Sequence, residues 1–135
     1  MSALARGWQK RRGVLLDVLP AVTALVLMFW LGLTPLKSLP GPDFELADKV
    51  WHAIAFGGLA GLLSRALVYF GRAALRAARE ASLVSVTLGA LLEVLQSFTR
   101  YRSADWADLL ADALGVALAY GVLRALDAAA ARGTA

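Results

Sequence analysis

Carboxylate and imidazole side chains recur at helical spacing in two short segments of this chain. The segment DKVWH, residues 48–52, contains the chain's single histidine, His52. The segment ADWADLLAD, residues 104–112, carries three aspartates within two helical turns, and Glu93 lies shortly before it. An imidazole or a buried carboxyl group can transfer protons near neutral pH when burial and neighbouring charges adjust its pKa. The candidates for such acid–base chemistry are therefore His52, Glu93 and Asp108.

Six further polar residues near these candidates could form a binding network: Asp48, Lys49, Gln96, Arg102, Asp105 and Asp112. The cations of Lys49 and Arg102 suit an anionic headgroup such as a phosphate. The acids and His52 could also act as ligands of a divalent metal. However, no tight metal-ligand spacing occurs, and the chain has no cysteine and no second histidine. The sequence therefore predicts neither a metal site nor a cofactor.

These residues must be positioned by helices that contact lipid. The 135 residues are 59% hydrophobic, which exceeds the apolar share of an average soluble domain. A helix that crosses a bilayer needs roughly 20 mainly apolar residues. Four runs approach that length, and they are Leu/Ala-rich without the alternation of a β-barrel. The predicted spans are residues 14–33, 50–70, 81–98 and 106–126. We expect an all-α, integral membrane four-helix bundle, with a basic segment at residues 1–13, a membrane domain at 14–126 and a tail at 127–135.

The distribution of basic residues predicts the orientation of the bundle. Ten of the 14 lysines and arginines fall at the N-terminus, in the connection between the second and third spans, or at the C-terminal end. Because loops rich in Lys and Arg stay in the cytoplasm, both termini are expected there. The first run is longer than a signal-peptide core and lacks a small-residue cleavage site, which favours a retained anchor.

With this topology, the polar residues of the second, third and fourth spans share one depth near the outer face. Helical geometry places them within roughly 10 Å of the outer boundary. Ionisable residues at membrane depth usually face the bundle interior, so we expect an outward-facing polar pocket. A structural interpretation competes with this one. Asp105 could cap the fourth helix, and the remaining residues could hold the helices in register. The glycines Gly57 and Gly61 have the spacing of a close helix contact.

The same residues resemble the VanZ-like family of small bacterial membrane proteins. The resemblance lies in DKVWHAIAFGGLAG and in EVLQSFTRYRSADWADLLADALG, and it covers about residues 46–121. The family pattern is Asp-Lys-x-x-His, then Glu-x-x-Gln, then Arg-x-x-Asp-x-x-Asp-x-x-x-Asn-x-x-Gly. This chain departs from it at Asp112, where the family often has Asn. The resemblance implies a location in the bacterial cytoplasmic membrane and a cell-envelope role, and the family's namesake is associated with teicoplanin resistance.

Two functions are compatible with this pattern, and the sequence does not choose between them. In the first, the outer pocket binds or modifies a lipid-linked or cell-wall component, and the resemblance extends this to glycopeptide resistance. In the second, the protein is a non-enzymatic assembly or partner-binding module whose charged cluster is structural. The expected partners are membrane lipids, a lipid-linked envelope precursor and, in a homo-oligomer, a second copy of the chain. The basic residues form no continuous face with stacking aromatics, so nucleic acid is not expected.

Overall fold

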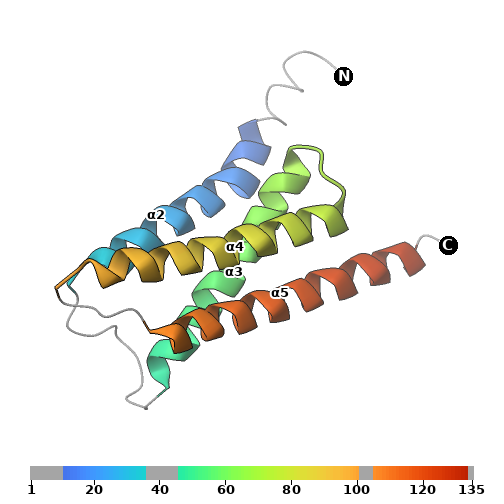
Figure 1. Ribbon diagram of the computed structural model, residues 1–135. Helices are drawn as coiled ribbons and strands as arrows, with labels where there is room; N and C mark the ends of the chain where they lie inside the picture. Colours follow the sequence, from blue (N-terminus) through green and yellow to red (C-terminus); the bar gives the residue numbers. More distant parts are fainter. Residues whose placement is uncertain (1–10, 36–45, 101–104, 134–135) are drawn as a thin grey trace.

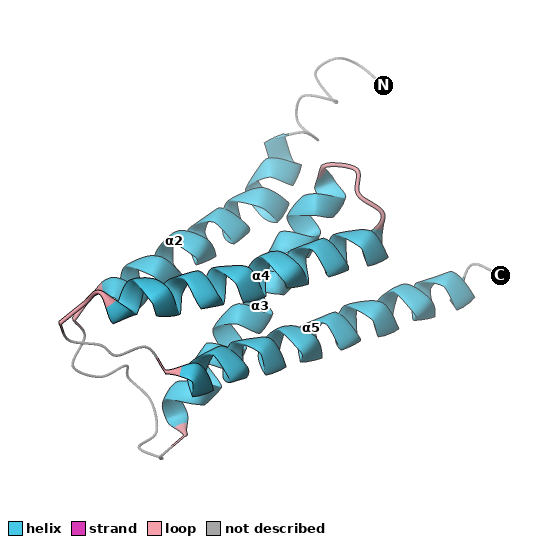
Figure 2. Ribbon diagram, viewed as in Figure 1, coloured by secondary structure: helices cyan, strands magenta, loops and turns pink. Residues whose placement is uncertain are grey.

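The computed structural model describes residues 11–35, 46–100 and 105–133, and every regular element in these ranges is helical. The π-helical segment η1 (Val14–Val18) runs directly into α2 (Leu19–Leu33). It is followed by α3 (Ala47–Tyr69), α4 (Ala74–Ser97) and α5 (Trp106–Gly133). The prediction of an all-α chain with four helices is confirmed for the described residues (Figure 2).

Two helices are longer than the apolar runs that predicted them. The helix α4 begins at Ala74, well before the predicted start at residue 81, and α5 continues beyond residue 126 to Gly133. Both extensions are rich in alanine, which favours helix, and both carry charged residues, which lower their hydropathy. Hydropathy therefore located the apolar part of each helix and not its ends.

The helices form an antiparallel bundle in which α3 occupies the centre. It contacts α5, α4, α2 and η1 (Figure 1). At one end of the bundle α2 and α4 stop and α3 and α5 start, and we call this the acidic end. At the opposite end η1 and α4 start and α3 and α5 stop, and we call this the arginine end. The topology places the start of α3 and the start of α5 side by side.

Apolar side chains fill the core and also cover much of the outside. The core consists of Phe56, Leu59, Ala60, Leu92 and Val116, contributed by α3, α4 and α5. On α5 an apolar stripe faces outward at four-residue intervals: Leu110, Leu114, Leu118, Val122 and Leu126. Three helices of the described part are long and apolar enough to cross a membrane, namely Arg11–Leu33, Ala47–Tyr69 and Trp106–Gly133. The helix α4 is not among them.

The helices α3 and α5 pack closely against each other at two glycines. A Cβ atom on Gly57 would lie 2.7 Å from the backbone oxygen of Gly115, and one on Gly115 would lie 2.0 Å from that of Ala53. No side chain fits at either position. Gly61, by contrast, has nothing within 4 Å of its ideal Cβ. The spacing of Gly57 and Gly61 had predicted a close helix contact at both. The prediction is correct for Gly57 and wrong for Gly61.

Proline accounts for the π-helical segment at the start of the first helix. Pro20 has no N–H group, so it leaves the backbone oxygen four residues earlier without its helical donor. Next to it, the Leu19 N–H bonds to the Val14 oxygen five residues back, which is the π pattern. Asp17 lies within this segment and receives hydrogen bonds from Arg65 of α3 at 2.7 and 3.2 Å. The widened turn is therefore tied to α3 by an ion pair.

A glycine closes α3 before the chain turns into α4. Gly71 has φ +89°, which is the left-handed conformation that glycine adopts without strain. The Gly71 N–H bonds to Val68 O at 2.9 Å, and the Arg72 N–H bonds to Leu67 O at 3.0 Å. This pair of bonds is a Schellman motif. It satisfies the last carbonyl groups of α3 and permits the short reversal that makes α3 and α4 antiparallel.

Candidate functional site

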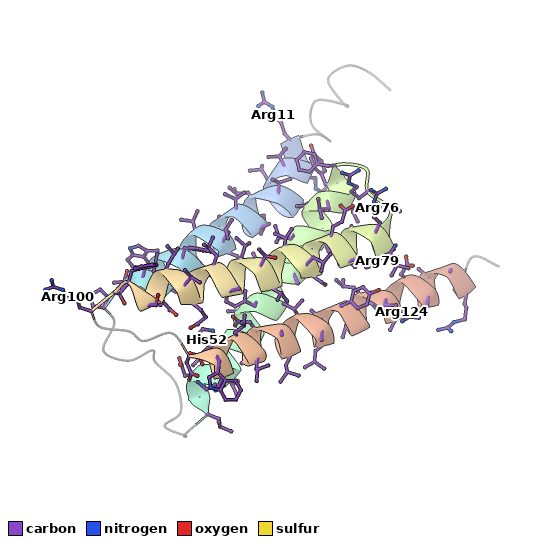
Figure 3. All side chains as sticks on the ribbon, in the orientation of Figure 1. Arg11, His52, Arg76, Arg79, Arg100 and Arg124 are labelled. Carbon is purple, nitrogen blue, oxygen red and sulfur yellow. The ribbon has the colours of Figure 1, made fainter. Side chains whose placement is uncertain are left out.

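Seven polar residues gather at the acidic end of the bundle, and we call them the polar cluster. Three come from the first turns of α3, one from the last turns of α4 and three from the start of α5: Asp48, Lys49, His52, Glu93, Asp105, Asp108 and Asp112. His52 is the labelled member of the cluster in Figure 3. The cluster forms there because the acids recur at helical spacing on α5, whose first two turns face α3.

A buried carboxylate holds the imidazole of His52. Nδ1 of His52 lies 2.9 Å from Oδ1 of Asp112, which is 0% exposed. Nε2 of the same ring lies 3.7 Å from Oδ2 of Asp108. The ring of Phe56, one helical turn further along α3, stacks on the imidazole with 6.3 Å between ring centroids. A carboxylate at Nδ1 fixes that nitrogen as the donor, so Nε2 is the nitrogen left for chemistry or binding.

Lys49 bridges two aspartates at the start of α5. Its Nζ donates to Oδ2 of Asp105 at 2.6 Å and to Oδ1 of Asp108. The hydrogen bond from Lys49 is the main reason why the pKa of Asp105 lies below its ordinary value. A second cause is the bond that Asp105 accepts from the backbone N–H of Ala107. Lys49 therefore already has two carboxylate partners and is not a free cation for an anionic ligand.

Asp105 and Glu93 also have structural roles. Asp105 caps α5, because its Oδ1 accepts the Ala107 N–H at 2.8 Å. Glu93 of α4 accepts the backbone N–H of Asp105 through Oε2 at 2.9 Å. The end of α4 is thereby fastened to the start of α5. One oxygen of the candidate acid–base group Glu93 is committed to this bond, which leaves His52 as the better-placed candidate.

Buried oxygen atoms without a hydrogen-bond partner in the described part of the structure lie on α4 and α5. They are Oγ of Ser85, Oε1 of Glu93 and Oδ2 of Asp112. Ser85, Gly89 and Glu93 follow one another at four-residue intervals on α4, which places them on one face. A Cβ on Gly89 would lie 2.6 Å from Oδ2 of Asp112. Gly89 thus makes room for the Asp112 carboxylate between the two helices.

Gln96 and Arg102 are the two predicted site residues not found in this cluster. Gln96 is buried, but its Nε2 donates to the backbone oxygen of Gly32 in α2 at 3.0 Å. Its contact therefore secures α2 to α4. Arg102 lies outside the described residues. Asp48 is exposed, and one of its oxygens lies within 4.8 Å of ligand atoms of His52 and Asp108.

Sequence reasoning missed Gly89, which shapes the site without carrying a functional group. The available signal was its position midway between Ser85 and Glu93 at four-residue intervals. A small residue in such a stripe indicates a close approach by the facing helix. The sequence alone does not say that the approaching group is a carboxylate.

Comparison with known proteins supports the resemblance in the sequence. No curated protein and no solved structure gives a significant match to the chain. The VanZ/LLP1 family matches it over residues 15–127, which includes α2, α3 and α4, most of α5 and every member of the polar cluster. The chain therefore belongs to the VanZ/LLP1 family.

Proposed function

We propose that this chain is a four-span protein of the bacterial cytoplasmic membrane, with both termini in the cytoplasm and the polar cluster facing outward. Figure 3 shows Arg11, Arg76, Arg79 and Arg124 towards the arginine end, as cytoplasmic residues would lie. The exposed apolar stripe of α5 supports lipid contact. α4 is proposed as a span because it is antiparallel to α3 and α5 and exposes Leu83, Val84, Leu91 and Val94.

The proposed orientation has a direct test. A phosphatase reporter fused at Arg102 should be active, because alkaline phosphatase folds outside the cytoplasm, and one fused at Gly71 should be inactive. The reverse pattern would place the polar cluster on the cytoplasmic side and overturn the envelope function below.

We further propose that the polar cluster binds the headgroup of a lipid-linked or cell-wall component and carries out acid–base chemistry on it. The observation that carries this proposal is the pair His52–Asp112. A fully buried carboxylate orients the imidazole and leaves Nε2 available beside Asp108. A general base oriented by a second group is the arrangement that proton transfer requires.

Precursor profiling of a deletion strain tests this function. The deletion should change the level of one lipid-linked or cell-wall precursor, and wild-type protein should restore it. His52→Gln should accumulate in the membrane without restoring the level. Asp127→Asn, an exposed acid at the other end of α5, is the matched control and should restore it. Teicoplanin susceptibility of the same strains tests the proposed link to glycopeptide resistance.

A specific observation also supports the alternative, a structural and partner-binding module. Glu93 accepts the backbone N–H of Asp105 at the start of α5, and Gln96 donates to a backbone oxygen of α2, so both of these α4 residues hold neighbouring helices. If His52→Gln restores the precursor level while Glu93→Ala and Gln96→Ala abolish accumulation, the cluster is a helix lock and the acid–base proposal fails.

A further inference from the structure

Three residues of the polar cluster bring ligand atoms together from two helices. Asp48, His52 and Asp108 each offer one nitrogen or oxygen atom, and these atoms all lie within 4.8 Å of one another. Asp48 and His52 are one turn apart on α3, and Asp108 projects from the first turn of α5. The spacing within either segment does not reveal this set, which is why the sequence predicted no metal site.

The hydrogen bonding of His52 suits a metal ligand. Because Nδ1 contacts Asp112 at 2.9 Å, the available nitrogen is Nε2, and it lies 3.7 Å from Oδ2 of Asp108. Neighbouring ligands on a divalent cation with bonds of about 2.1 Å are roughly 3 Å apart, so a small adjustment would suffice. Histidine ligands commonly donate their second ring N–H to a carboxylate, as His52 does to the buried Asp112.

The charges of the cluster also favour a bound cation. Its carboxylates number five, and they come from Asp48, Glu93, Asp105, Asp108 and Asp112. Among the described members only Lys49 and His52 can oppose them. One oxygen of Glu93 and one of Asp112 are buried without a hydrogen-bond partner there. Arg100 points away from His52 in Figure 3. Since buried negative charge is costly without compensation, a cation bound next to these carboxylates would stabilise their ionised form.

We propose that the protein binds one divalent transition-metal cation, of the Mn²⁺ class, through an oxygen of Asp48, Nε2 of His52 and Oδ2 of Asp108. Two carboxylates and one imidazole suit such a cation better than they suit Mg²⁺, which prefers oxygen alone. Lys49 holds the other oxygen of Asp108 and does not displace the metal. Three protein ligands leave positions for water and for a phosphate oxygen. With the cation bound, Nε2 of His52 is a ligand, so the general-base role proposed for it above belongs to the metal-free protein alone. The phosphate part rests on the proposed headgroup function.

Electron paramagnetic resonance of Mn²⁺ tests the metal site on the purified full-length protein in dodecyl maltoside. After chelation and dialysis, the protein should bind one Mn²⁺ per chain, with modulation from a coordinated ¹⁴N nucleus. His52→Gln should remove the nitrogen signal. Asp48→Asn and Asp108→Asn should weaken binding about tenfold or more, and Asp112→Asn by about 10- to 100-fold as an outer-shell residue. Asp127→Asn should match wild type.

Asp48→Asn keeps the test decisive if variants of buried residues fold poorly, because Asp48 is exposed. Mn²⁺ binding that lacks the ¹⁴N signal, or that Asp48→Asn leaves unchanged, would overturn the metal site. A ³¹P coupling should appear on addition of inorganic phosphate or of phosphatidic acid, and the stronger response identifies free phosphate or a lipid headgroup as the ligand. If Mn²⁺ binds with neither coupling, the phosphate part fails while the metal site stands. An unchanged precursor profile would overturn only the proposed function.

Discussion

The carboxylate of Asp112 in α5 meets the imidazole of His52 in α3 at 2.9 Å, and the carboxylate is completely buried. This contact orients the one histidine of the chain and joins two helices.

Replacing Asp112 separates these two roles. Asp112→Ala removes the acceptor for Nδ1 of His52 and leaves a buried donor unsatisfied, which should lower the free energy of unfolding by about 1–3 kcal/mol. Asp112→Asn keeps an acceptor oxygen and introduces the residue that is frequent in the family pattern, so its free energy of unfolding should fall by less. Unfolding in mixed detergent micelles measures both changes. Equal losses for the two variants would show that the oxygen of residue 112 does not support His52.

The glycine contact between α3 and α5 should tolerate no side chain. Gly115→Ala would place Cβ 2.0 Å from the oxygen of Ala53. The helices must separate, and the free energy of unfolding should fall by about 1–3 kcal/mol or more. Gly61→Ala and Gly121→Ala are matched controls, because nothing lies within 4 Å of their ideal Cβ atoms. These two should be neutral or stabilising by about 0.5–1 kcal/mol. A stable Gly115→Ala protein would contradict the close packing.

Gly89 and Asp112 should be energetically coupled across α4 and α5. A Cβ at Gly89 would lie 2.6 Å from Oδ2 of Asp112, so Gly89→Ala should destabilise wild type. In an Asp112→Ala background the obstructing oxygen is gone, and Gly89→Ala should cost less. A double-mutant cycle should give a coupling of about 0.5–3 kcal/mol. Additive effects would mean that Gly89 does not accommodate this carboxylate.

The Lys49–Asp105 pair predicts a pH dependence of stability. Because Lys49 lowers the pKa of Asp105 in the folded protein, the ionised carboxylate stabilises the fold at every pH above the unfolded pKa. This stabilisation is lost as the pH falls through the folded pKa. Asp105→Asn keeps a capping oxygen but removes the charge. Wild type should therefore be the more stable protein at pH 5–7, and the difference should close below about pH 4. A difference that is constant down to pH 3 would contradict the pair.

Much of the fold could be predicted, because four apolar runs separated by polar segments specify four helices in order. The positions of the helix ends could not be predicted from hydropathy. Ala74 and Gly133 lie in alanine-rich stretches that are helical but also contain charged residues. The turn after α3 also follows from a particular residue. Gly71 closes α3 because it can adopt a positive φ.

For the candidate site, helical spacing predicted which residues lie on one side of a single helix. It did not indicate how the helices rotate against one another. Gln96 follows Glu93 by one turn, yet it bonds to Gly32 of α2 while Glu93 bonds to α5. Likewise, the partner of His52 at Nδ1 is Asp112 on another helix, not Asp48 one turn away. Such pairings depend on packing between distant segments, which the spacing of a single helix does not record.

The 60 positions that separate His52 from Asp112 have a consequence for biosynthesis. Chains are made from the N-terminus, so α3 leaves the ribosome well before α5 exists. Lys49 and His52 are therefore present in the nascent chain before any of their partners at the start of α5 has been translated. A nascent chain that stops before Asp105 would therefore contain Lys49 and His52 without the α5-end carboxylates that they contact in the folded protein.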